Sequence, residues 1–187
     1  MIYVEALSRL KEDTKGTTLF LAGGITNCPL WQETMVKLLG DTDFVLLNPR
    51  RANFPIGDPS AALEQVTWEH RHLRLADAIL FWFPAETLCP IVLFELGAWT
   101  MTDKLIFVGV HPEYARRKDV EIQTRLARPE IEVVYSLEDL ARQVVRKEKI
   151  MTENKENKRS WWEEAAPVLI WVVVLSIVLG TIISLAF

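Results

Sequence analysis

The stretch AILFWFPAETLCPIVLFELGAW, residues 78–99, decides which fold class the chain can adopt. Residues 78–84 form an unbroken apolar run, which is typical of a strand buried on both faces of a sheet. Pro90 suits the first turn of a helix, whose N–H groups have no partner inside the helix, and we predict a helix over 90–102. Glu95 stands in that helix with apolar residues on every side, where an unpaired buried carboxylate is costly.

The same alternation of apolar run and helical pattern continues in both directions from this stretch. The predicted strands are 18–22, 44–49, 78–84, 104–110 and 131–135, and the predicted helices are 29–39, 61–75, 90–102, 114–127 and 136–149. The strand runs are apolar throughout, so both faces of the sheet must be covered by helices. The pattern predicts an α/β fold with a doubly wound sheet of about five parallel strands.

Composition limits the classes of partner. Of the 187 residues, 50% are hydrophobic and 25% are charged, which indicates a domain with a real core. The net charge of −4 gives no basic footprint, so we expect no nucleic-acid partner. Cys28 and Cys89 are far apart and lack metal-ligand spacing, so we expect no metal. With no signal-peptide pattern at the start, we expect a reduced, cytoplasmic domain.

Residues 165–187 contain no charged side chain. As a helix they would be about 34 Å long at about 1.5 Å per residue, and a bilayer core is about 30 Å thick. We predict a transmembrane helix here, with a buried core helix as the alternative, after a domain over 1–149 and a charged linker over 150–164. Lysines and arginines before the helix place the domain in the cytoplasm, as in a single-pass, tail-anchored protein that contacts membrane lipid.

Three segments follow predicted strands, at the edge where parallel sheets bind ligands: 23–26, 48–51 and 84–89. Gly23 and Gly24 allow close approach of the backbone to a ligand and can present N–H groups to an anion, although a tight turn explains them equally well. Arg50 is placed to meet a phosphate, or is a surface residue. Glu95 follows the last of these segments, where a buried acid can do chemistry.

The helix before strand 78–84 carries a second acid, Glu69, which is either a catalytic group or part of a solvated helix face. Trp68 beside it could stack on a base. Asp77 is suited to capping the helix end or the strand start. His70 and His72 point to different sides of a helix and are not expected to bind a metal together.

The motifs FLAGGIT, LNPRR, TWEHRHLRLADAILFWFP and CPIVLFELGAW, within about residues 17–140, resemble the nucleoside 2-deoxyribosyltransferase family. The resemblance implies a flavodoxin-like fold and cleavage of the N-glycosidic bond of a nucleoside or nucleotide. It implies that Glu95 is the nucleophile and Glu69 the assisting acid. We expect no cofactor. The candidate substrate-binding residues are Gly23, Gly24, Asn48, Arg50, Trp68 and Asp77.

Residues 88–90, Leu-Cys-Pro, depart from the family pattern, which has an aspartate before the nucleophile to handle the proton of the base. This departure weakens the implication of transfer more than that of glycosidic cleavage. The resemblance also implies a homo-oligomer, with His111 and Tyr114 as candidates to reach into a neighbouring subunit.

The leading hypothesis is a membrane-tethered enzyme in which ionised Glu95 traps the sugar and protonated Glu69 serves the leaving base. A membrane-anchored nucleotide sensor, which binds in the same pocket without turnover, is the alternative. A tethered scaffold with a degenerate pocket is a third possibility.

Overall fold

The computed structural model describes residues 1–10, 14–55, 58–150 and 153. The chain divides into two compact units, Met1–Val145 and Arg146–Phe187, and the first contains the whole sheet. The transmembrane helix predicted for 165–187 and nearly all of the predicted linker lie outside the described residues. Within the described ranges, no helix combines the length and apolarity that a membrane crossing requires.

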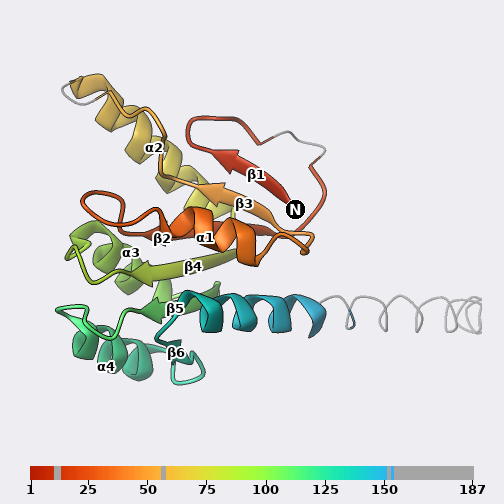
Figure 1. Cartoon of the computed structure of the whole chain (residues 1–187), viewed down its shortest axis with the longest axis vertical. Coiled ribbons are helices and arrows are strands. Elements are labelled where there is room, and N and C mark those ends of the chain that lie inside the picture. Colours follow the sequence, from red (N-terminus) through yellow and green to blue (C-terminus); the bar gives the residue numbers. More distant parts are fainter. Residues whose placement is uncertain (11–13, 56–57, 151–152, 154–187) are drawn as a thin grey trace, which may run out of the picture. The chain divides into compact units, whose positions relative to one another are not determined.

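Six parallel strands form one sheet in the order β1-β3-β2-β4-β5-β6 (Figure 1). The strands are β1 (Ile2–Glu5), β2 (Thr18–Gly23), β3 (Val45–Asn48), β4 (Ala78–Phe83), β5 (Leu105–Val110) and β6 (Val133–Val134). All five predicted strands are present, and β3-β2-β4-β5-β6 is the flavodoxin-like order. The edge strand β1 was not predicted.

The helices are α1 (Trp31–Leu38), α2 (Pro59–Leu75), α3 (Pro90–Thr100) and α4 (Arg117–Ala127), and residues 137–145 form a further helical segment of the first unit. The prediction for 114–127 began the helix too early. The backbone there first makes two turns, in which Tyr114 N–H donates to His111 O and Arg117 N–H donates to Tyr114 O.

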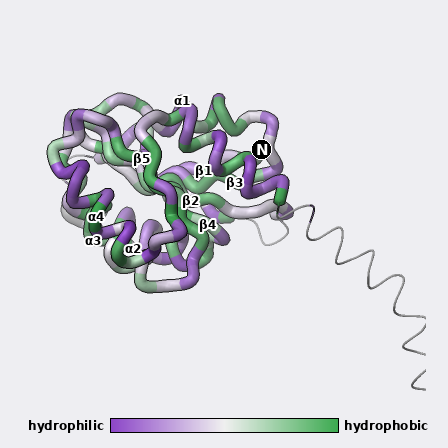
Figure 2. Tube along the Cα trace, turned by 90° about the horizontal axis from the view of Figure 1, so that it is seen from below, coloured by the Kyte–Doolittle hydropathy of each residue, from purple (hydrophilic) through white to green (hydrophobic). Residues whose placement is uncertain are grey.

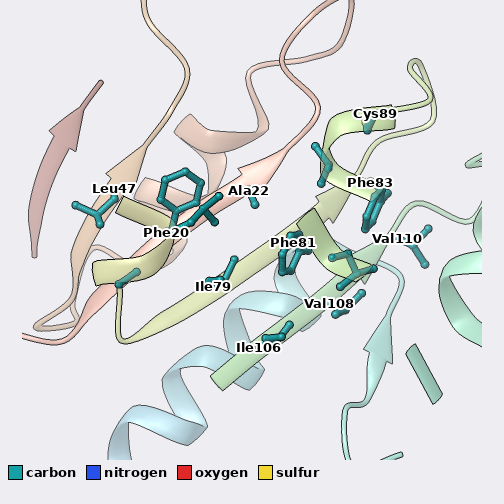
Figure 3. Close-up of a cluster of buried hydrophobic side chains, with 14 of the residues drawn as sticks. Phe20, Ala22, Leu47, Ile79, Phe81, Phe83, Cys89, Ile106, Val108 and Val110 are labelled. Carbon is teal, nitrogen blue, oxygen red and sulfur yellow. The ribbon is translucent and has the colours of Figure 1, made fainter. Parts of the chain in front are cut away.

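The core lies on both faces of the sheet. On one face the side chains of β2, β4 and β5 pack against α2, α3 and α4, and Figure 3 shows part of this layer. On the other face the alternate side chains pack against α1 and the 137–145 segment. Both faces of β4 are therefore buried, which explains its unbroken apolar sequence. Hydropathy follows the same division, with hydrophobic central strands and mixed helices (Figure 2).

Helix α3 begins as expected at Pro90, directly after Cys89, whose φ of 48° is left-handed. The loop before α3 is held by Tyr114, whose hydroxyl donates to Leu88 O at 2.6 Å. Tyr114 is only 3% exposed, so it supports its own chain rather than reaching into a neighbour as predicted.

The apolar side chains of α3 divide between two surroundings. Val92 and Leu96 are buried against the sheet, while Ile91, Phe94 and Met101 are 65%, 76% and 80% exposed. Among the residues that the structure describes, one side of this helix therefore leaves large apolar side chains uncovered.

Candidate functional site

A cavity of about 860 Å³ lies over β2, with α2 and α3 as its walls. Its floor includes Phe20 and Ala22, and the segment 23–26 closes the carboxyl end. β2 and β4 are neighbours in the sheet. After β2 the chain continues to β3 on one side of this pair, and after β4 it continues to β5 on the other side. This divergence is a topological switch point, where open α/β sheets bind ligands. The position and size suit a small organic ligand.

Glu95 lines the cavity from the second turn of α3. It is partly buried, and it makes no hydrogen bond or ion pair with any residue that the structure describes. Burial, together with the nearby charge of Glu69, raises the pKa of Glu95 to about 7. A carboxyl that is unpaired in a cavity and titrates near neutrality is suited to acid, base or nucleophilic chemistry.

Glu69 lines the opposite wall, on α2. Its Oε1 accepts a hydrogen bond from Gln65 Nε2 at 2.8 Å. Burial raises the pKa of Glu69, and the amide bond from Gln65 opposes that rise. The fold thus places the two acids that the sequence singled out in the lining of one cavity, where the charge of Glu69 disfavours the ionisation of Glu95.

Gly23 and Gly24 also line the cavity, and packing explains why both are glycine. A Cβ on Gly23 would lie 2.4 Å from the Trp31 ring, and one on Gly24 would lie 2.7 Å from the Pro84 ring. The carbonyl of Gly24 accepts the indole N–H of Trp31 at 2.8 Å. The absence of a Cβ at Gly23 and Gly24 therefore lets the loop after β2 pass close to the carboxyl edge of the sheet.

Asn48 and Arg50 do not line the cavity. Asn48 is 5% exposed; its Nδ2 donates to the Tyr3 hydroxyl and its Oδ1 accepts the Arg50 N–H. The Arg50 guanidinium donates to Pro29 O at 2.8 Å and to Cys28 O at 3.2 Å. In this structure both side chains hold the loops at the ligand edge.

Trp68 and Asp77 also lie away from the cavity lining. Trp68 is 7% exposed, stacks on His72 at 3.9 Å between ring centroids, and donates its indole N–H to Ser8 O. Asp77 stands at the start of β4, and its Oδ2 accepts both the backbone N–H and the hydroxyl of Thr18. Asp77 therefore caps the first residue of the neighbouring strand β2, whereas the sequence predicted a cap on the end of its own helix or the start of its own strand.

Several lining residues were not singled out as site residues from the sequence. His70 and Arg74 lie on α2, and Phe94 and Trp99 lie on α3. Trp99 follows Glu95 by four residues, the spacing that places two side chains on one face of a helix. His70, Arg74 and Phe94 have no such spacing from either acid.

Cys89 lines the cavity as well, but burial, together with the nearby Cys28, raises the pKa of its thiol to about 12. A thiol that stays protonated is a poor nucleophile. The two carboxyls are therefore better candidates for the reacting groups than this cysteine.

A family model described as "Nucleoside 2-deoxyribosyltransferase like" matches residues 16–114. The match runs from just before β2 to Tyr114 and includes every residue that lines the cavity. No curated protein matches the chain.

Proposed function

The chain belongs to the nucleoside 2-deoxyribosyltransferase-like family, and from this premise we propose that it cleaves the N-glycosidic bond of a nucleoside or nucleotide with Glu95 as nucleophile. Membership of this family indicates an enzyme that transfers a glycosyl group and takes a nucleoside as its substrate. The observation that carries the finer proposal is the unpaired Glu95 carboxyl in the wall of the cavity, with Glu69 near enough to raise its pKa.

The two acids have different tasks in the proposed reaction. The Glu95 carboxylate attacks the anomeric carbon as the bond to the base breaks, and a covalent sugar ester forms. The bonding electrons leave with the base nitrogen, which takes a proton from Glu69. Water, or a second base, then attacks the anomeric carbon of the ester and gives its proton to Glu69, while the Glu95 carboxylate leaves. Water gives hydrolysis, and a base gives transfer.

The reaction needs opposite protonation states of the two acids. Glu95 must be ionised, and with a pKa of about 7 it is ionised in about half of the molecules at neutral pH. The charge of Glu69 disfavours the ionisation of Glu95, so the two acids titrate as a coupled pair, in which one form carries a single proton. Placing that proton on Glu69 gives the reactive form.

A second candidate function is a nucleotide sensor that binds without turnover. The raised pKa of Glu95 favours it, because a neutral carboxyl is a poor nucleophile.

The proposal includes a membrane anchor and a second copy of the chain. The charge-free sequence of 165–187 supports a single-pass anchor with the catalytic unit in the cytoplasm. The exposed apolar side chains of Ile91 and Phe94 on α3, and of Met101 at its C-cap, support a homo-oligomer, because a second copy would bury them.

The test uses the full-length protein with a panel of nucleosides, deoxynucleosides and their 5′-phosphates, and mass spectrometry detects the released base. We expect release by the wild type and a loss of about a thousandfold or more in Glu95→Gln. Glu64→Gln, an exposed glutamate of α2 outside the cavity lining, is the matched control and should retain activity.

Base release that survives Glu95→Gln would refute the nucleophile. Thermal stabilisation by a nucleotide with no base released would favour the sensor, and the absence of both effects would refute both functions.

A further inference from the structure

The amide of Gln65 is buried beside the acid pair. Gln65 lies on α2, one turn before Glu69, and is 9% exposed. Its Nε2 donates to Pro49 O at 2.6 Å and to Glu69 Oε1 at 2.8 Å. A primary amide nitrogen carries two hydrogens, so these two bonds use both of them.

The orientation of this amide follows from its partners. The Pro49 carbonyl can only accept a hydrogen bond, so the atom 2.6 Å from it must be the nitrogen. The second hydrogen on the same nitrogen then points to Glu69, whose Oε1 must accept it. Since Oε1 accepts, a proton on the Glu69 carboxyl has to reside on Oε2.

The oxygen of the same amide is left unsatisfied. Gln65 Oε1 is buried and has no hydrogen-bond partner among the described residues. Such an atom is a cost to the folded state that an apolar side chain of similar length would avoid. The two hydrogen bonds that Nε2 donates, to Pro49 O and to Glu69 Oε1, are therefore the reason for a glutamine at this position.

We propose that Gln65 is a positioning residue of this site: it fixes one oxygen of Glu69, confines the exchangeable proton of that carboxyl to the other oxygen, and ties the acid to the loop after β3. The part that concerns catalysis rests on the proposed function, since the proton on Oε2 is the one the leaving base would receive. The part that concerns the carboxyl itself does not depend on turnover.

Gln65 also affects the protonation of both acids. A hydrogen bond donated to a carboxylate favours its ionised form, so loss of the donor leaves Glu69 protonated up to a higher pH. The charge of Glu69 then opposes ionisation of Glu95 less, and Glu95 ionises at a lower pH.

The first test is Gln65→Met, which keeps the length of the side chain and removes both donors. The glutamate carboxyl carbons of the full-length protein are labelled with ¹³C, and their titrations are followed by NMR, with Glu69→Gln and Glu95→Gln to assign the two signals. We expect the apparent pKa of Glu69 to rise by about half a unit or more and that of Glu95 to fall.

Gln32 provides the matched control. It is 1% exposed, its Nε2 donates to Gly24 O at 3.4 Å, and its Oε1 accepts from the Arg50 guanidinium at 3.3 Å. Gln32→Met therefore removes another buried amide that ties a loop of the same cavity, without touching either acid. We expect it to leave both carboxyl titrations where they are in the wild type.

The second variant, Gln65→Glu, tests the donor directly. A carboxyl at position 65 can donate to Glu69 only while it is protonated, so we expect the Glu69 signal to approach its wild-type behaviour at low pH and to depart from it as the pH rises. If the protein turns over substrate, kcat should follow the same pH dependence, while KM changes less than twofold. In Gln65→Met, we expect kcat to fall about tenfold.

Identical titrations of Glu69 in the wild type and Gln65→Met would overturn the proposal, as would equal shifts in Gln65→Met and Gln32→Met. If Glu69 shifts as expected but no variant or wild type releases a base, Gln65 holds the acid and the proposed function is what fails.

Discussion

The two ends of the parallel sheet treat their acids in opposite ways. At the amino end, Asp77 accepts two hydrogen bonds from Thr18, and its own N–H donates to the Thr18 hydroxyl at 2.8 Å. Beside it, the Lys104 ammonium donates to the carbonyls of Arg74 and Ala76. In the cavity that extends from the carboxyl end, Glu95 has no partner among the described residues, and Glu69 has a single amide donor.

The difference separates acids that stabilise the fold from acids that remain available to a ligand. An acid whose carboxylate oxygens already accept hydrogen bonds within its own fold has few lone pairs free to accept one from a ligand. Its hydrogen bonds stabilise the strand ends instead. An acid that is partly buried without such bonds raises the free energy of the folded state, and a bound sugar can supply what is missing. We therefore expect substitutions at the two ends to have opposite effects on stability.

The largest expected stability effect is at Glu95. Its pKa is about 7 in the folded state and 4.5 without the fold, so between these values the unfolded chain binds fewer protons. The contribution of this group to stability is thus fully present below about pH 4.5 and is lost as the pH rises toward 7. Because the side chain is partly exposed, we expect a loss of about 2 kcal/mol.

Glu95→Gln removes this titration. We expect the variant to exceed the wild type in melting temperature by about 6 °C at pH 8 and to match it near pH 4.5. Differential scanning calorimetry of both proteins across this range measures the difference, with Glu64→Gln as the control for loss of one negative charge. A constant difference between wild type and Glu95→Gln at all pH values would show that the carboxyl is not perturbed in the folded protein.

Much of the fold was predictable because its signals are local. Each central strand is apolar on both faces, and Pro90 marks the start of α3. The edge strand β1 escaped prediction because one neighbour, β3, holds it, and Ile2 and Tyr3 are 45% and 43% exposed. Its sequence therefore shows no continuous buried run.

The site was predictable only in part. A sequence pattern can place a residue at the carboxyl edge of the sheet, but it does not show which atoms its side chain contacts there. Glu95 stood out since its neighbours are apolar, whereas for Glu69 only the resemblance decided between a catalytic group and a solvated helix face. Asn48 and Arg50 follow a strand just as a ligand-binding residue would, yet both turn to hydrogen-bond partners in their own fold. The role of Gln65 depends on contact with the carbonyl of Pro49, which no local pattern reports.

An intermediate effect is expected at the amino end. Asp77→Ala removes both acceptor bonds to Thr18, and because the group is exposed we expect a loss of about 1.5 kcal/mol of unfolding free energy. Urea denaturation followed by circular dichroism measures this loss. Below the unfolding transition, base release per folded molecule should stay within twofold of the wild type. A loss of turnover comparable to that of Glu95→Gln would mean that Asp77 takes part in the chemistry from the far end of the sheet.

The smallest expected effect is a change in KM on substitution of Arg50. This residue lies at the carboxyl end of the sheet, but like Asp77 it forms its hydrogen bonds with its own fold. Its guanidinium donates to the carbonyls of Cys28 and Pro29, so Arg50→Lys should loosen the loop after β2 and raise KM about threefold. If the arginine acts only on the loop, KM rises by the same factor for a nucleoside and for its 5′-phosphate. If it binds phosphate, the 5′-phosphate alone loses affinity, by about tenfold or more. The ratio of the KM values for the nucleoside and its 5′-phosphate therefore decides whether Arg50, which already donates hydrogen bonds to its own loop, also contacts the ligand.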